Sequence, residues 1–322
     1  MHLSLLSLSQ TPTTPCKPSS FNWTTTKSTS VNLGGWLFQE STIDNTFWTS
    51  HAPIASDEWT LCKTLGDACG PILEHRYRTF IARADIDTLA SVGLYSGNQR
   101  TYLRRITEYA TSRYGMHVTI DVHSLSGGLN GLMTGEATGH WGWFFNETAW
   151  AHSMEVVDEV LEFIGGSSSP GSFTLEPMNE PADRNGDDDL GMAVFGTPEA
   201  LSDDAASYVL SFWQAVLARV TESGLDVAVM FQSFKLPDIG LAELPDFIRS
   251  DAQNKSGDVT FPVFVGEWSI QAAYNNSFAL KERNLKFGLE AWEEYMQGLC
   301  YWTANQRDYW SFERFIEEGF LL

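Results

Sequence analysis

Apolar runs alternate with amphipathic segments along most of the chain, and this pattern predicts strands that alternate with helices. The strand-like runs lie at 31–38 (with the loop after the strand), 117–123, 173–176, 226–231, 261–265 and 299–302. Apolar residues recur at helical spacing at 78–90, 101–114, 156–164, 201–221 and 285–296, and 242–252 is helix-like. Strands that are apolar almost throughout are typical of a parallel sheet covered by helices on both faces.

Polar side chains stand at the carboxyl ends of several predicted strands. Asp121 and His123 end one strand, Glu180 follows the next, and Glu267 ends a later one. A (β/α)8 barrel builds its active site at that edge. A doubly wound open sheet is the alternative, but no glycine-rich phosphate-binding segment follows a strand, which argues against a nucleotide-binding sheet.

The second and sixth strands of a complete barrel are not visible in this pattern. The helix that ends at Gly93 runs through 94–99 into the next helix, and only a loop and the helix-like 242–252 precede the strand at 261–265. The sequence therefore predicts an α/β fold with an incomplete (β/α)8 TIM barrel. Because a closed barrel has a fixed strand number, shear and tilt, either the chain is an aberrant gene product that lacks segments, or the sheet closes in another way.

The first part of the chain differs in composition from the rest. Residues 10–30 are rich in Ser, Thr and Pro, which predicts a leader or flexible arm at 1–30 ahead of a single domain at 31–322. The apolar run at 1–9 lacks a basic start and a small-residue cleavage site, so it matches a signal peptide poorly. No stretch reaches the length of a transmembrane helix.

Cysteines and glycosylation sequences favour an extracellular protein. A Cys62–Cys69 disulfide across a glycine-containing loop is plausible in an oxidising compartment. Sequences of the Asn-x-Ser/Thr type occur four times, at Asn22, Asn146, Asn254 and Asn275.

Composition excludes several classes of partner. Hydrophobic residues make up 43% of the chain and aromatic residues 13%, as in a folded globular protein. The formal net charge of -21 argues against nucleic acid and anionic membranes as partners, since both attract positive charge. A neutral sugar is indifferent to this charge, and flat aromatic rings can stack on its apolar face.

Two carboxylates carry the candidate chemistry. Glu180 and Glu267 each follow an apolar, strand-like run, so both side chains can face one pocket. Cleavage of a glycosidic bond needs such a pair, one to protonate the leaving oxygen and one to act as base or nucleophile. For Glu180 the alternative is a loop or helix-capping carboxylate. A charge at Glu267 must face a cavity or be paired.

Other polar residues near this edge have more than one interpretation. His123 lines the pocket or is a buried core histidine, and Asp121 faces the same side and can orient it. Further ligands at metal-binding spacing are absent, so we expect no metal and no cofactor. We interpret Glu176 as structural. Its side chain would be buried more deeply than that of Glu180, where an ionised carboxylate would need a partner cation.

The motifs around these residues resemble glycoside hydrolase family 5, and especially fungal exo-β-1,3-glucanase-like enzymes and rutinosidase-type β-glucosidases. The resemblance covers roughly residues 30–315. The matching sequences are Asn32-Leu-Gly-Gly-Trp36 with Glu40, Asp121-Val-His123, Glu176-Pro-Met-Asn-Glu-Pro181, Val265-Gly-Glu-Trp268 and Tyr301-Trp302.

The resemblance implies a role for each matching residue. Glu180 would be the general acid/base and Glu267 the nucleophile of a retaining double displacement. The substrate-binding residues would be Asn179 at the 2-hydroxyl, Glu40 at other sugar hydroxyls, Trp302 beneath the sugar ring and His123 at the pocket floor. The family also has an arginine at the end of its second strand that supports the nucleophile, and this chain shows no such strand.

The sequence thus predicts a retaining β-glycosidase that hydrolyses β-glucans or β-glucosides, similar to exo-1,3-β-glucosidases. Its catalytic carboxyl groups should lie about 5–5.5 Å apart. Burial and like charge should raise the pKa of Glu180, and hydrogen bonds should lower that of Glu267. Alternatives are an inactive member that still binds carbohydrate, a diglycoside-specific (rutinosidase-type) enzyme and an endo-acting glucanase. We expect a carbohydrate substrate, no nucleic acid or membrane partner, and a monomer.

Overall fold

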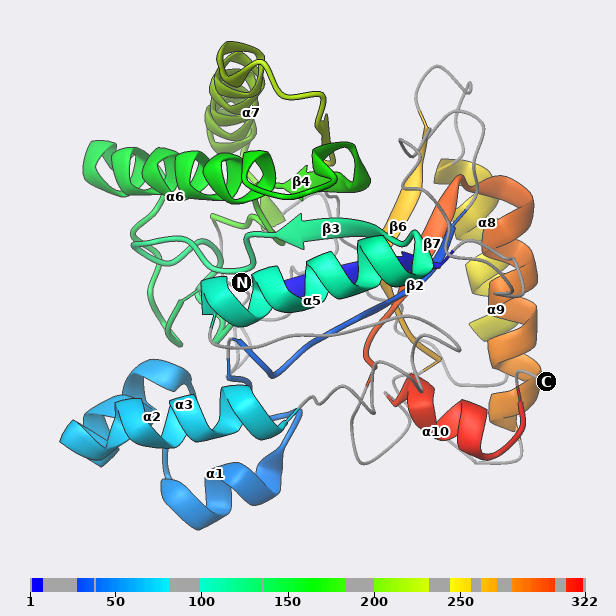
Figure 1. Ribbon diagram of the computed structural model, residues 1–322, viewed down its shortest axis with the longest axis horizontal. Helices are drawn as coiled ribbons and strands as arrows, with labels where there is room; N and C mark the ends of the chain where they lie inside the picture. Colours follow the sequence, from blue (N-terminus) through cyan, green and yellow to red (C-terminus); the bar gives the residue numbers. More distant parts are fainter. Residues whose placement is uncertain are drawn as a thin grey trace.

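The computed structural model describes residues 2–7, 28–37, 39–80, 99–134, 136–183, 200–231, 244–255, 262–270, 280–304 and 311–320. These residues form an α/β fold around one sheet (Figure 1). Its strands are β1 (His2–Ser7), β2 (Ser28–Asn32), β3 (His117–Asp121), β4 (Phe173–Glu176), β5 (Ala228–Val229), β6 (Phe264–Trp268) and β7 (Gly298–Tyr301).

All strands of the sheet except β1 run in the same direction. The spatial order is β5-β4-β3-β1-β2-β7-β6. The pairs β3–β4, β4–β5, β2–β7 and β6–β7 are parallel, whereas β1 is antiparallel to both β2 and β3. The carboxyl ends of the other strands therefore lie at one edge of the sheet, as the sequence predicts.

Strand β1 lies between β2 and β3, where the sequence pattern lacks a second strand. His2 is opposite Asp121 on one side, and Ser4 is opposite Asn32 on the other. The backbone groups of β2 and β3 that face each other across this gap thus find partners in β1. The segment expected to be a leader or arm contributes this strand to the sheet. The division into 1–30 and 31–322 remains a prediction.

Helices surround the sheet. They are α1 (Asn45–His51), α2 (Glu58–Leu65), α3 (Cys69–Thr79), α5 (Gln99–Tyr114), α6 (Glu147–Gly165), α7 (Asp203–Ser223), α8 (Leu244–Lys255), α9 (Lys281–Tyr295) and α10 (Phe312–Glu317), with 3-10 turns at Gly66–Ala68 and Pro170–Ser172. Figure 1 shows α6 and α7 beside β4, α8 and α9 beside β6 and β7, and α1 to α3 as a group of short helices. No helix in the described ranges is long and apolar enough to cross a membrane.

Local sequence explains where the long helices begin and end. Asn146 caps α6 by accepting hydrogen bonds from the N–H groups of Thr148 and Ala149, and Ser202 caps α7 in the same way. Helix α7 ends at Gly224, whose φ of 68° is readily adopted only by glycine. The apolar faces of both helices, with Val157 and Phe212 among their residues, are buried.

The predicted elements differ from the observed ones mainly at their boundaries. Strand β2 ends at Asn32, earlier than the predicted 31–38, and β5 has two residues where the pattern predicts 226–231. Most of the predicted helix 78–90 lies outside the described residues, because α3 ends at Thr79 and 81–98 is not described. The places expected for the sixth strand, 232–243 and 256–261, are also outside them.

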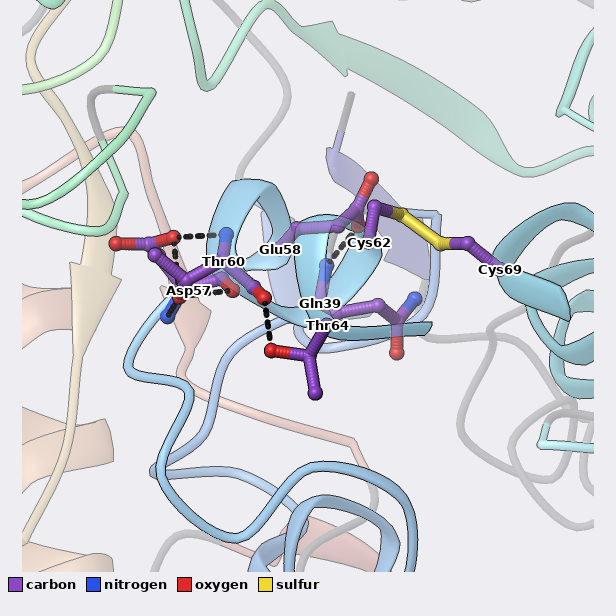
Figure 2. Close-up of a disulfide and its surroundings, with 7 residues drawn as sticks. All are labelled: Gln39, Asp57, Glu58, Thr60, Cys62, Thr64 and Cys69. Carbon is purple, nitrogen blue, oxygen red and sulfur yellow. Dashed lines mark hydrogen bonds between the residues drawn. A yellow bond between two sulfur atoms is a disulfide. The ribbon is translucent and has the colours of Figure 1, made fainter. Parts of the chain in front are cut away.

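A disulfide joins α2 to α3, which confirms the predicted pairing (Figure 2). Cys62 and Cys69 are bonded, with their Cα atoms 5.0 Å apart. Asp57 caps α2 by accepting a hydrogen bond from the N–H of Thr60 at 2.7 Å. Cys300 in β7 is a buried free thiol. The cross-link holds two short helices in one unit beside the carboxyl edge of β2.

Candidate active site

Carboxylates from four parts of the chain converge at the carboxyl edge of the sheet. Asp121 ends β3, Glu176 ends β4 and is followed by Glu180, Glu267 lies in β6, and Glu40 lies in the loop after β2. All are buried except Glu267, which keeps partial exposure. The charges of the other four all act on the pKa of Glu267. The structure therefore brings Glu180 and Glu267 within electrostatic range of each other.

His123 is at the centre of a hydrogen-bonded group. Its Nδ1 lies 2.7 Å from Asp121 Oδ2, and its Nε2 lies 3.2 Å from Asn179 Nδ2. With Nδ1–H donating to Asp121, Nε2 is free to accept from Asn179. The expected orientation of His123 by Asp121 is thus observed. Burial lowers the pKa of His123, but the charge of Asp121 and the hydrogen bond to it raise this pKa more, so the net direction is upward.

Trp302 packs against this hydrogen-bonded group. Its ring stacks on His123 with centroids 5.7 Å apart and planes 10° apart. A Cβ added at Gly34 would lie 2.5 Å from the Trp302 ring, so a larger residue at this turn would displace the indole. The predicted substrate-binding residues His123, Asn179 and Trp302 therefore lie together, with Asn179 adjacent to Glu180 in the chain.

The backbone of Glu180 has an unusual conformation. Its φ is 48°, in the left-handed region that a non-glycine residue occupies at a cost of about 1–3 kcal/mol. The Glu180 carbonyl accepts a hydrogen bond from Asn130 Nδ2 at 3.1 Å, and the N–H of Ala182 donates to the Leu129 carbonyl at 3.4 Å. The loop after β3 therefore holds Glu180 in this conformation.

The pKa of Glu180 is raised to about 7, chiefly by burial, with the nearby charge of Asp121 adding to the rise and that of His123 opposing it. Burial also raises the pKa of Glu40 to about 7, with the charges of Glu180 and Asp121 contributing. A carboxyl group with such a pKa is protonated in mildly acidic solution. Glu180 thus has the property that its predicted role requires.

The expectation of a lowered pKa for Glu267 is wrong. Burial and the charges of the surrounding carboxylates raise it well above the ordinary value. No hydrogen-bond donor among the described residues contacts the Glu267 carboxylate. The resemblance places an arginine at the end of a second strand, but β1 occupies that place with the sequence His-Leu-Ser-Leu-Leu-Ser, which contains no Lys or Arg. β1 therefore supplies no Arg or Lys that would favour the ionised form of Glu267.

Glu176 belongs to the same acidic cluster, a membership that sequence reasoning missed. A Cβ added at Gly266 would lie 3.6 Å from Glu176 Oε1, so this carboxyl group packs directly against β6. Burial raises its pKa well above the ordinary value, as do the charges of Asp121 and Glu180. No Lys or Arg among the described residues pairs with the Glu176 carboxyl group, and its raised pKa favours the protonated form. Only the alternation of side chains along β4 could have indicated this position.

Metal binding finds no support in the described part of the chain. No group of three or more His, Cys, Asp or Glu side chains there has an arrangement that could hold a metal ion. Near the carboxylates, Asn32 Nδ2 donates a hydrogen bond to the Gly266 carbonyl at 2.9 Å, and this bond connects the end of β2 to β6.

Comparison with solved structures decides the family. The crystal structure of rutinosidase from Aspergillus niger superposes with a TM-score of 0.88 at 48% sequence identity, over 94% of this chain and 99% of that one. The chain belongs to the rutinosidase group of glycoside hydrolase family 5. The crystal structure of AoRut superposes with a TM-score of 0.87 at 48% identity, over 94% of this chain and 98% of that one.

Curated relatives of this rutinosidase-group chain are more distant. The probable glucan 1,3-beta-glucosidase D of Aspergillus terreus is 30% identical over 47% of this chain and 21% of its own length. The probable glucan 1,3-beta-glucosidase A of Aspergillus niger is 26% identical over 78% of this chain and 67% of its own length. The chain thus spans much less than two thirds of the first of these relatives. No protein-family model matches it.

Proposed function

We propose that this protein is a retaining β-glycosidase in which Glu180 is the acid/base and Glu267 the nucleophile. The observation that carries the proposal is the buried group at the carboxyl edge of the sheet. There, burial raises the pKa of Glu180 to about 7, and the charge of Glu180 helps to raise the pKa of Glu267. The membership of the rutinosidase group supports the same reaction.

In the first step, the ionised Glu267 carboxylate attacks the anomeric carbon while the Glu180 carboxyl group gives its proton to the departing oxygen. The glycosidic bond breaks, and a glycosyl ester forms on Glu267. In the second step, the ionised Glu180 takes a proton from water, the water oxygen attacks the anomeric carbon, and Glu267 leaves. Asn179 would contact the 2-hydroxyl, Glu40 and His123 other hydroxyls, and Trp302 the ring face.

The substrate is a β-glucoside, and the comparisons favour a β-linked diglycoside of a rutinoside type over a β-1,3-glucan. The support is the 48% identity to rutinosidase over nearly the whole of both chains, against at most 30% to the glucan 1,3-beta-glucosidases quoted above. The protein would act as a monomer without a cofactor. The disulfide and the predicted glycosylation sequences support secretion into the medium.

The strand order also supports the predicted barrel ancestry. Without β1, the order β5-β4-β3-β2-β7-β6 is that of a (β/α)8 barrel opened between its fifth and seventh strands. We infer that β2 is the first barrel strand and that β1 takes the place of the second. No sixth barrel strand lies among the residues that the structure describes.

The test is hydrolysis by the purified chain of 4-nitrophenyl β-glucoside and of rutin. We expect release of rutinose from rutin, and loss of turnover in Glu267→Ala. Azide should restore activity to Glu267→Ala and give an inverted glycosyl azide, because it enters the space left by the carboxylate. Undiminished activity in Glu267→Ala would refute the proposal.

A second candidate is a member that binds carbohydrate but turns it over poorly. The observation that favours it is the raised pKa of Glu267, because a protonated carboxyl group is a weak nucleophile. Calorimetric binding of glucose without hydrolysis of either substrate would support this candidate.

A further inference from the structure

Glu40 is the member of the acidic cluster that comes from the loop after β2. It lies in the loop between β2 and α1, and its backbone bridges to Asp57 at the start of α2. The adjacent Gln39 is completely buried. The N–H of Gln39 donates to Glu58 Oε2 at 2.8 Å (Figure 2). The side-chain amide of Gln39 donates to the Trp36 carbonyl at 2.6 Å. The position of Glu40 therefore depends on contacts made by its neighbours.

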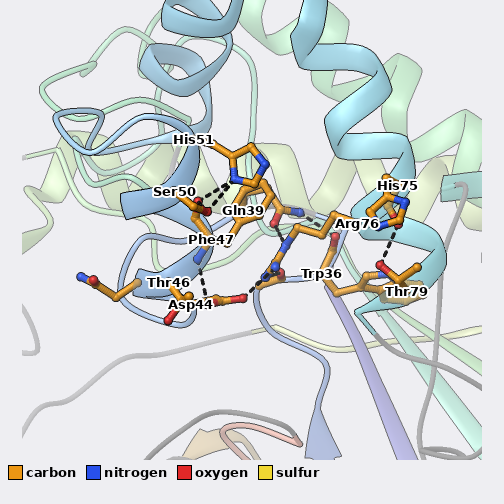
Figure 3. Close-up of polar contacts among 12 residues, drawn as sticks. Trp36, Gln39, Asp44, Thr46, Phe47, Ser50, His51, His75, Arg76 and Thr79 are labelled. Atoms are coloured by element: carbon orange, nitrogen blue, oxygen red, sulfur yellow. Dashed lines mark hydrogen bonds and ion pairs between the residues drawn. The ribbon is translucent and has the colours of Figure 1, made fainter.

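One buried guanidinium connects three points of this loop (Figure 3). Arg76 of α3 donates through Nε to Gln39 Oε1, through Nη2 to the Gly35 carbonyl at 2.9 Å, and through Nη1 to Asp44 Oδ2 at 2.9 Å. Its side chain is 6% exposed. These contacts reach residues on both sides of Glu40. The neighbouring Trp36 Nε1 also donates to the Tyr77 carbonyl of α3 at 3.1 Å.

Aromatic rings fix the plane of this guanidinium. The Phe47 and Phe80 ring centroids lie 4.4 Å and 3.8 Å from Arg76 Cζ. A planar fork that donates in three directions while stacked on rings is a geometry that lysine cannot reproduce. Burial of a cation is unfavourable unless hydrogen bonds compensate for the lost hydration, and here these hydrogen bonds go to the loop that carries Glu40.

We propose that Arg76 is a positioning residue that sets the Glu40 carboxyl group against the sugar through Gln39. The inference rests on the proposed function, in which Glu40 binds sugar hydroxyls. Because Arg76 does not touch the reacting atoms, its loss should weaken sugar recognition through Glu40 and leave the acid/base behaviour of Glu180 unchanged.

The experiment is a double-mutant cycle of Arg76→Met and Glu40→Gln, measured as kcat/KM and as the Kd of glucose by calorimetry. We expect each single variant to lower kcat/KM by roughly tenfold, and the double variant to be no worse than Glu40→Gln alone, because both remove one interaction. Arg76→Lys should not restore activity. The pH dependence of kcat/KM above pH 7 should be that of the wild type.

Arg104→Met is the matched control. The Arg104 guanidinium also stacks on a ring, with Cζ 3.9 Å from the Phe163 centroid, and pairs with Glu108, but on α5 and away from the carboxylates. We expect this variant to lose thermal stability and to keep its kcat/KM. If Arg76→Met does not fold, Gln39→Leu provides the same test, since it removes the amide between Arg76 and Trp36.

Additive losses in the cycle, or wild-type kinetics in Arg76→Met, would overturn the inference. If Glu40→Gln leaves both kcat/KM and glucose binding unchanged while Glu267→Ala is inactive, the proposed function stands and this inference fails. If Glu267→Ala stays active, the proposed function fails, and the cycle is then judged on glucose binding alone.

Discussion

At the scale of single residues, the site combines acidic groups that would repel one another if all were ionised. Burial and mutual charge raise the pKa values of Glu40, Glu180, Glu176 and Glu267. The charge of Asp121 and the hydrogen bond to it raise the pKa of His123, the imidazole among these carboxyl groups. The raised pKa values favour protonated carboxyl groups, so we expect activity to depend steeply on pH.

We expect kcat/KM to fall above about pH 7, where Glu180 loses its proton and can no longer donate to the leaving oxygen. The loss should approach tenfold per pH unit. Glu180→Gln should abolish this limb and lower kcat/KM for a poor leaving group by about 10²–10⁴-fold. A 2,4-dinitrophenyl glycoside, whose leaving group needs no proton, serves as the control. If kcat/KM of Glu180→Gln still falls above about pH 7, the fall is caused by another titrating group.

At the scale of elements, the chemistry depends on turns and short helices that position side chains from different strands. The turn after β2 illustrates this, because Gly34 packs against Trp302 from the end of β7. The Gly34 N–H also donates to Thr303 Oγ1 at 2.9 Å. The two strands are parallel neighbours in the sheet, so this contact fixes the Trp302 ring, which we propose stacks on the sugar, relative to Glu40.

Gly34→Ala should displace the Trp302 ring and lower kcat/KM by roughly 100-fold, as small misplacements of a binding group can. The matched control is Gly266→Ala, because an added Cβ there meets Glu176 Oε1 at 3.6 Å, an ordinary contact distance. Steady-state kinetics with 4-nitrophenyl β-glucoside and the near-ultraviolet circular dichroism of tryptophan measure the difference. Equal losses in both variants would contradict this account.

The sequence predicts the helices and strands that are specified by residues close together in the chain. Helices α6 and α7 have clear apolar periodicity and capping residues, and β3 and β4 are apolar runs bounded by turns. Helices α1 to α3 are short, and contacts such as the Arg76 network and the disulfide stabilise them, so no periodicity reveals them. The candidate carboxylates follow from motifs. The pKa of Glu267 does not, because it depends on burial and on carboxylates that come from other parts of the chain.

At the scale of the whole molecule, the sheet is built around an antiparallel strand from the start of the chain. β1 pairs with β3 from His2 to Leu6 and with β2 from Ser4 to Ser7, and so joins β3, β4 and β5 to β2, β7 and β6. The catalytic residue proposed in β6 and the one proposed after β4 lie in different halves of this sheet. Their alignment therefore depends on β1.

Removal of residues 1–7 should leave the facing backbone groups of β2 and β3 unpaired, and we expect the melting temperature to fall by about 10 °C or more, with aggregation. Leu5→Pro should act in the same direction because it removes a backbone donor within β1, whereas Leu5→Ala keeps that donor. Differential scanning calorimetry measures each variant. A truncated protein with unchanged melting and activity would show that β1 is dispensable for the sheet.

The direction of β1 has a practical consequence for handling the protein. Since His2 is opposite Asp121, anything attached ahead of it begins at the edge of the sheet where the sugar would enter. An affinity tag fused there would crowd the substrate, and a cleavable linker or a tag elsewhere in the chain avoids this obstruction.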